Sequence, residues 1–201
     1  MSVTHRPHLI STEAELRALI GEPTKLVQQK LSSRLNELTR EFIAASPFVL
    51  VGTAARGGGL DVSPKGDPAG FVRILDDTTL LLPDRPGNRL ADTLTNLLDD
   101  PRIALLFLIP GVDEMFRVNG TARITDDPEL LAASAVEAKT PKLGLLIDIE
   151  EAYTHCSKAA LRAELWNPEH HRERSELPSN GAIMSRLTDG NVDPATYDAE
   201  R

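Results

Sequence analysis

The spacing of apolar residues changes along the chain, from a helical period near the start to short β-like runs in the middle. Between residues 12 and 45, Leu, Val and Phe recur every three or four positions, which is typical of amphipathic helices. Thr12 and Glu15 form a capping box before a first helix, and Gly21-Glu22-Pro23 separates it from a second. Ser46-Pro47 ends the second helix, because the residue before a proline avoids helical angles.

From Phe48 onward the apolar runs are short, rich in β-branched residues and bounded by turn signals, which predicts strands. Asp76-Asp77 indicates a tight hairpin between two of these runs. The predicted strands are 48–54, 60–63, 71–75, 79–83, 102–109, 114–124 and 142–155. The helices predicted between and after them are 90–98, 128–139 and 157–166.

The links between most of these strands are too short for parallel pairing, since a parallel crossover takes about a dozen residues or more. The sequence therefore predicts an α+β fold in which six or seven antiparallel strands form a barrel with flanking helices. The expected divisions are an N-terminal helical segment 1–46, a barrel domain 47–166 and a polar C-terminal tail 167–201.

Composition and charge exclude several classes of function. The 201 residues include 22 Lys and Arg against 30 Asp and Glu, a formal net charge of −8, so general binding to nucleic acid or to an anionic membrane is not expected. No apolar run reaches the roughly 18 residues of a membrane span, and no secretory signal is visible. Cys156 is the only cysteine, which excludes an intramolecular disulfide and a multi-cysteine zinc site. We expect no metal site and a location in the reducing cytoplasm.

Basic and hydroxyl side chains gather in two short segments, each after a predicted strand. The first segment carries Ser63 and Lys65. The second carries Arg85, Asn88 and Arg89, and it opens a predicted helix. Cations, hydroxyl and amide donors, and the free N–H groups of a helix start are what a phosphate monoester requires. From the spacing alone, two solvated polar loops remain the alternative, and none of the common nucleotide, hydrolase or metalloprotease motifs occurs.

Three motifs in order give a more specific indication: SPKGD at 63–67, PDRPGN at 83–88 and LLFLIPG at 105–111. With these motifs the chain, from about Glu15 to Trp166, resembles the pyridoxamine 5'-phosphate oxidase-related family of FMN-binding split β-barrels, in particular a bacterial subgroup. The resemblance implies an FMN-binding flavoprotein that is a homodimer, with FMN at the subunit interface and a small-molecule electron donor and acceptor. Part of the outer face of strand 102–109 would then pack against the partner subunit.

The resemblance also implies roles for individual residues. Arg89 is the first choice for the FMN phosphate, and Lys65 is expected near the flavin ring or the ribityl chain. Lys158, Arg162 and Trp166 lie on a C-terminal segment that would cover the isoalloxazine of the partner's flavin. No catalytic side chain is implied. The predicted cofactor-binding residues are Ser63, Pro64, Lys65, Leu82, Pro83, Arg85, Asn88, Arg89, Lys158, Arg162 and Trp166.

The sequence departs from pyridoxamine phosphate oxidases proper in the elements that hold the substrate. The predicted helix 128–139 lacks the Tyr and Arg of the Tyr-x-x-x-Arg element, and the C-terminal part has no Arg-x-His. We therefore expect an oxidoreductase that acts on another small organic acceptor or on O₂. A non-catalytic FMN carrier or sensor, and a split barrel that uses haem or F420, remain the alternatives.

Overall fold

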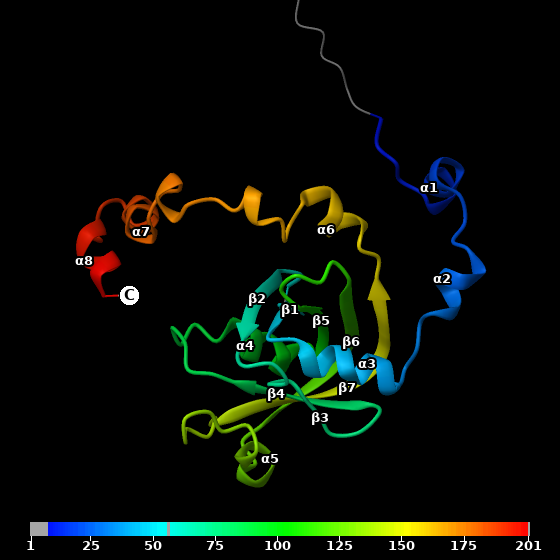
Figure 1. Ribbon diagram of the computed structural model, residues 1–201, viewed down its shortest axis with the longest axis horizontal. Helices are drawn as coiled ribbons and strands as arrows, with labels where there is room; N and C mark the ends of the chain where they lie inside the picture. Colours follow the sequence, from blue (N-terminus) through cyan, green and yellow to red (C-terminus); the bar gives the residue numbers. More distant parts are fainter. Residues whose placement is uncertain (1–7, 56, 201) are drawn as a thin grey trace, which may run out of the picture. The chain divides into compact units, whose positions relative to one another are not determined.

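Seven antiparallel strands form one sheet in the part of the chain that this computed structural model describes, residues 8–55 and 57–200 (Figure 1). The strand order is β2-β1-β5-β6-β7-β4-β3, and the sheet is open, with β2 and β3 at its edges. The predicted α+β class with an antiparallel sheet and flanking helices is confirmed. The bounds are β1 Phe48–Ala54, β2 Leu60–Gly66, β3 Arg73–Ile74, β4 Thr79–Asp84, β5 Arg102–Leu108, β6 Met115–Thr125 and β7 Leu143–His155.

The long hairpin of β6 and β7 organises the sheet. β5 pairs with residues 116–121 in the first half of β6, whereas β4 pairs with residues 143–148 in the first half of β7. Because the two strands are antiparallel, the β2-β1-β5 group and the β4-β3 group attach at opposite ends of the hairpin. This arrangement is the predicted split barrel.

The helices differ from prediction where tertiary contacts interrupt a helical pattern. The prediction of one continuous second helix up to residue 45 is wrong. The helix is interrupted where Ser32 forms a β-bridge with Ala152 of β7, and a new helix begins after its N-cap residue Asn36. The predicted helix 128–139 ends at Ala132, since Val136 and Lys139 close a turn instead. The helices before β7 are α1 Glu13–Ile20, α2 Lys25–Gln29, α3 Glu37–Ala45, α4 Asp92–Asp99 and α5 Pro128–Ala132.

The chain divides into two compact units, of which the first ends at Ser157 and contains the whole sheet. The second begins at Lys158 and consists of short helices: α6 Lys158–Ala163, the 3-10 helices Pro168–His170 and Arg174–Glu176, α7 Asn180–Leu187 and α8 Pro194–Ala199. The predicted divisions at residues 46 and 166 stay a prediction. Among the described residues, no helix is both long enough and apolar enough to cross a membrane.

The core lies on the inner face of the sheet. Phe116 of β6 packs between Phe107 of β5 and Phe42 of α3, with ring centroids 6.5 and 6.0 Å apart. Helix α4 packs against β1, and its Asn96 donates a buried hydrogen bond of 3.0 Å to the hydroxyl of Thr53. A buried polar group needs a partner to offset its desolvation, so this bond fixes the rotation of α4. The first turn of α4 is therefore held in one orientation.

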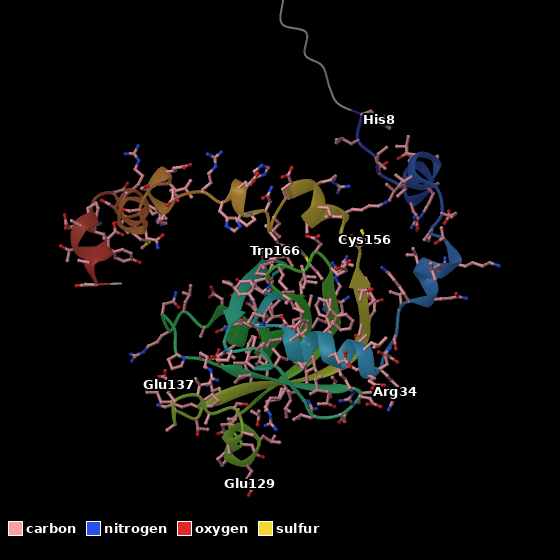
Figure 2. All side chains as sticks on the ribbon, in the orientation of Figure 1. His8, Arg34, Glu129, Glu137, Cys156 and Trp166 are labelled. Atoms are coloured by element: carbon pink, nitrogen blue, oxygen red, sulfur yellow. The ribbon has the colours of Figure 1, made fainter. Side chains whose placement is uncertain are left out.

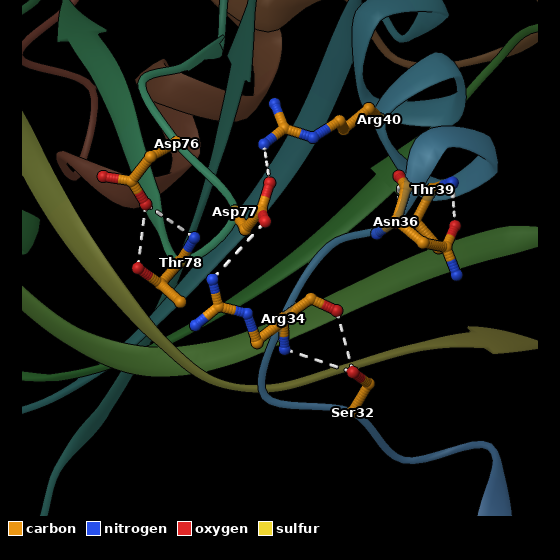
Figure 3. Close-up of polar contacts among 8 residues, drawn as sticks. All are labelled: Ser32, Arg34, Asn36, Thr39, Arg40, Asp76, Asp77 and Thr78. Atoms are coloured by element: carbon orange, nitrogen blue, oxygen red, sulfur yellow. Dashed lines mark hydrogen bonds and ion pairs between the residues drawn. The ribbon is translucent and has the colours of Figure 1, made fainter.

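Hydrogen bonds connect the turn before β4 to α3 and to the segment that precedes it (Figure 3). The carboxylate of Asp77, in the turn between β3 and β4, accepts hydrogen bonds from Arg40 and, at 3.4 Å, from Arg34. The hydrogen bond from Arg40 lowers the pKa of Asp77, so the carboxylate is charged at neutral pH. The side chain of Asn36 caps α3 by accepting from the amide of Thr39. These contacts hold β4 at one end, while its other end leads into the candidate site.

Candidate functional site

Three elements meet around a cavity of about 190 Å³, which we call the α4 cavity. They are the edge strand β2, the loop that follows β4, and the N-terminus of α4. The residues that line the cavity are Ser63, Lys65, Asp84, Arg85, Gly87, Asn88, Arg89, Leu90, Ala91, Asp92, Thr93 and Leu94. The two basic segments that the sequence singled out thus lie together, as predicted from their positions after strands.

The strand predicted at 60–63 continues to Gly66 as β2, so Pro64 and Lys65 lie in a strand and the prediction of a loop from residue 64 is wrong there. An edge strand tolerates Pro64, since proline removes only one ladder donor. Alternate residues of a strand point to the same face, so Ser63 and Lys65 both line the cavity. The continued pairing of β2 with β1, in which Lys65 lies opposite Val49, is the reason for the difference.

The hydroxyl groups of Ser63 and Thr93 lie on one wall of the α4 cavity and contact the carboxylate of Asp61. The Oγ of Ser63 donates to Oδ2 of Asp61 at 3.1 Å, and Oγ1 of Thr93 lies 3.3 Å from the same oxygen and 3.2 Å from Ser63 Oγ. The prediction missed Asp61 and Thr93. Strand alternation could have found Asp61, because residues 61, 63 and 65 share a face.

The three basic residues of the cavity differ in how their charges are neutralised. Lys65 Nζ lies 3.3 Å from Asp84 Oδ1. Arg85 is bound on two sides, because its Nε donates to Asp67 at 2.5 Å and its Nη2 donates to the carbonyl of Ser134 at 2.8 Å. Arg89 is exposed and has no ion pair among the residues that the structure describes. Its guanidinium is therefore the cation with the most hydrogen-bonding capacity left for a ligand.

The N-terminus of α4 is unusual among the helices of the first unit. Its N-cap residue, Ala91, has a left-handed conformation with φ of 58° and provides no side-chain cap, whereas α1, α2, α3 and α5 each have one. Arg89 is left-handed too, with φ of 66°. Such conformations are strained for residues with a side chain and cluster at ligand sites. The first N–H groups of α4 are thus left for an anion, which the helix dipole also favours.

Some predicted cofactor-binding residues do not line this cavity. Leu82 and Pro83 are buried in β4, and Leu82 belongs to the hydrophobic core. Lys158 and Arg162 lie on α6, and Trp166 follows it, all in the second unit. The cofactor-binding roles of all eleven predicted residues, whether or not they line the cavity, stay predictions.

A second polar cluster lies near the end of β7. Lys30 Nζ lies 5.0 Å from the ring centroid of Tyr153, and Arg117 donates to the Tyr153 hydroxyl at 2.9 Å. The Nε2 atom of His155 is buried and has no hydrogen-bond partner in the described part of the chain. Burial, with smaller contributions from Arg117 and Lys30, lowers the pKa of His155. Cys156 is exposed, and the described residues contain no group of three or more side chains that could hold a metal ion.

A comparison with protein families decides the assignment. The family model described as pyridoxamine 5'-phosphate oxidase matches residues 35–156, more than half of the chain. The chain belongs to this family. The matched range lies within the predicted extent of the resemblance and includes every residue of the α4 cavity. The name of the pyridoxamine 5'-phosphate oxidase family denotes an oxidase, so the match supports a general oxidoreductase role.

Solved structures similar to this family member share low sequence identity with it. HupZ of Group A Streptococcus is 20% identical, with a TM-score of 0.49, over 60% of this chain and 93% of that one. A putative pyridoxamine 5'-phosphate oxidase of Lactobacillus delbrueckii is 20% identical, with a TM-score of 0.47, over 61% and 95%. An FAD-binding protein of Mesorhizobium loti is 16% identical, with a TM-score of 0.42, over 63% and 99%. The comparison with curated proteins found no match.

Proposed function

We propose that this protein is an FMN-dependent oxidoreductase and that the α4 cavity holds the phosphate of FMN. One observation carries the proposal: the uncapped N-terminus of α4 opens into the same cavity as the guanidinium of Arg89, which has no ion pair with any described residue. This arrangement occurs within the range that matches the pyridoxamine 5'-phosphate oxidase family.

The donor groups of the cavity fit a phosphate monoester, which carries roughly −1.5 to −2 charges at pH 7. Arg89 can donate two parallel hydrogen bonds, and the N–H groups of α4 donate from the helix start. Lys65 is paired with Asp84, and its ammonium group has further N–H donors for the ligand. The volume of about 190 Å³ is below the ~300–1,000 Å³ of pockets that hold a whole small-molecule ligand. The cavity therefore suits the phosphate end, and the rest of FMN would extend beyond it.

The hydroxyl cluster has a different role in this proposal. Ser63 donates its hydrogen to Asp61, so the oxygen of Ser63 presents lone pairs to a ligand. Lone pairs repel a phosphate but accept hydrogen bonds from hydroxyl groups. We assign Ser63 and Thr93 to the ribityl chain, next to the phosphate.

When it is bound, FMN supplies hydride and electron transfer, and the protein supplies binding, orientation and electrostatics. A homodimer would complete the site. Leu60 and Val62 of the edge strand β2 are 86% and 66% exposed, and apolar residues exposed next to a binding site are typical of an interface. In this proposal Lys158, Arg162 and Trp166 of one subunit would cover the flavin of the other.

Turnover distinguishes the oxidoreductase from a flavin carrier or sensor. The full chain is loaded with FMN, freed of excess cofactor and mixed with NADH or NADPH without oxygen, and then with air. We expect a yellow protein whose flavin absorbance bleaches faster than that of free FMN and returns with oxygen. A yellow protein without faster bleaching would indicate the carrier. A protein that stays colourless with FMN, but takes up haem or F420, would contradict the proposal.

A further inference from the structure

A second and larger cavity, of about 510 Å³, adjoins the α4 cavity. Its walls come from the end of β4 with the following loop and from residues 136–143, which precede and begin β7. We call it the β7 cavity. Asp84, Arg85 and Arg89 line both cavities, so the two share one wall. Glu137, labelled in Figure 2, lies on the other wall.

The β7 cavity has an excess of positive charge in a chain whose net charge is −8. Its charged lining residues are Arg85, Arg89, Lys139, Lys142, Asp67, Asp84 and Glu137. Two of the carboxylates are already paired, Asp67 with Arg85 and Asp84 with Lys65. Three cations are left to face one carboxylate, that of Glu137. None of the three has an ion pair within residues 8–55 and 57–200.

Apart from Thr140, the rest of the lining is apolar. Pro86, Val136, Pro141 and Leu143 contribute to the walls, and Pro141 is buried. A volume of about 510 Å³ lies within the ~300–1,000 Å³ of small-molecule pockets, which combine apolar walls with a few polar groups. The cavity therefore combines an apolar wall with a cationic rim.

The rim is held in a strained conformation. Val136 and Lys139 exchange backbone hydrogen bonds of 2.8 and 3.2 Å around a two-residue turn. Both turn residues, Glu137 and Ala138, are left-handed, with φ of 49° and 61°, where Asn-Gly is the usual choice. Strain of this kind persists where the surrounding structure imposes it, commonly at ligand sites. The turn fixes the backbone of Lys139 at the edge of the cavity.

We propose that the β7 cavity binds a small organic carboxylate with an apolar body, and that such an anion is the substrate class of this protein. The ammonium groups of Lys139 and Lys142 would pair with the carboxylate, while Pro141 and Leu143 contact the apolar body. The charge that is left, three cations against Glu137, attracts an anion, and the apolar walls favour an anion with an apolar body. The second half of the proposal rests on the proposed function, because the shared wall of Arg85 and Arg89 places this ligand beside FMN.

Benzoate and its neutral analogue benzamide serve as probes, titrated calorimetrically into the full chain with and without FMN. We expect benzoate to bind about tenfold more tightly than benzamide, as one charge-assisted contact provides. In Lys139→Met/Lys142→Met, benzoate affinity should fall to that of benzamide. The matched control Lys25→Met/Arg186→Met, which removes two exposed charges on α2 and α7, should keep the preference. Thermal melts establish that each variant is folded.

Several results would overturn the proposal: no binding of either probe, equal binding of both, or a benzoate preference that survives Lys139→Met/Lys142→Met. Competition between benzoate and FMN would assign the β7 cavity to the cofactor, which overturns the substrate class and leaves the proposed function intact. If benzoate binds as expected but FMN does not bind at all, the proposed function fails and only the anion site stands.

Discussion

Arg85 and Arg89, four residues apart in the loop after β4, have different surroundings. Arg85 is partly buried, and both its Nε and its Nη2 are bonded within the protein, to Asp67 and to the carbonyl of Ser134. Arg89 is exposed, with no ion pair among the described residues. The sequence predicted both as cofactor-binding, because spacing gives no information about the partners that Arg85 finds in distant segments.

Truncation of the two arginines should therefore affect stability differently. Arg85→Ala leaves the Asp67 carboxylate without its partner and should lower the free energy of unfolding by about 1–3 kcal/mol. Arg89→Ala removes no such contact and should change it by less than about 0.5 kcal/mol. Urea unfolding of both variants measures this. Equal effects of the two substitutions would contradict the distinction.

His155 should make stability depend on pH. Its folded-state pKa is lowered from the ordinary value of 6.5, first by burial and then by Arg117 and Lys30. The unfolded chain therefore binds a proton more readily, so the stabilising contribution is present above pH 6.5 and is lost as the pH falls. His155→Gln should reduce the loss of stability between about pH 7 and pH 5, measured as urea midpoints. An unchanged pH dependence in the variant would show that His155 is not its source.

At the scale of elements, alternation and turn signals predicted the strands well. Helical periodicity predicted two helices that are too long, the one that ends at residue 45 and the one at 128–139. Val27, Leu31, Leu35 and Leu38 continue a helical spacing, but the chain leaves the helix where Ser32 pairs with the edge of β7. A bridge to a strand over a hundred residues away leaves no local signal. The strand β2 was predicted too short for a similar reason, because Pro64 is a local turn signal and its pairing with Leu50 is not local.

Among the glycines of the sheet, Gly120 is the one at which an added methyl group should lower the free energy of unfolding most. It lies at the β-bulge between β6 and β7, and a Cβ there would be 2.0 Å from the carbonyl oxygen of Asp148. A backbone atom cannot move aside as a flexible side chain can, so Gly120→Ala should cost about 3 kcal/mol or more. Gly87→Ala, with no atom within 4 Å, is the matched control and should be nearly neutral. Urea unfolding that gives similar values for both would contradict this.

At the scale of the whole molecule, the net charge is −8, yet two adjoining cavities are lined by basic groups. The sequence predicted the first, because its residues fall in two motifs that follow strands. It did not predict the second, because Lys139 and Lys142 fell at the end of a predicted helix and the start of a predicted strand. Only the turn that replaces the helix after Ala132 brings them to one rim.

The exposed apolar residues of β2 should be covered by a second copy of the chain. We expect the protein to sediment as a dimer. Leu60→Lys/Val62→Lys places two charges on that face and should yield a folded monomer with weaker FMN binding, because the site would lack its second half. The control Leu26→Lys/Leu38→Lys alters exposed residues of α2 and α3 and should remain a dimer. A wild-type protein that is monomeric at all concentrations would contradict the homodimer.

The central claim is that the α4 cavity recognises a phosphate through Arg89. The most direct test compares the affinities of FMN and riboflavin, which differ only in that phosphate, for the wild type and for Arg89→Ala by flavin fluorescence quenching. We expect the wild type to prefer FMN strongly, and Arg89→Ala to weaken FMN binding by about 1.5–3 kcal/mol, or about 10- to 150-fold, while riboflavin binding stays the same. Equal affinities of FMN and riboflavin for the wild type, or an equal loss of both in Arg89→Ala, would contradict it.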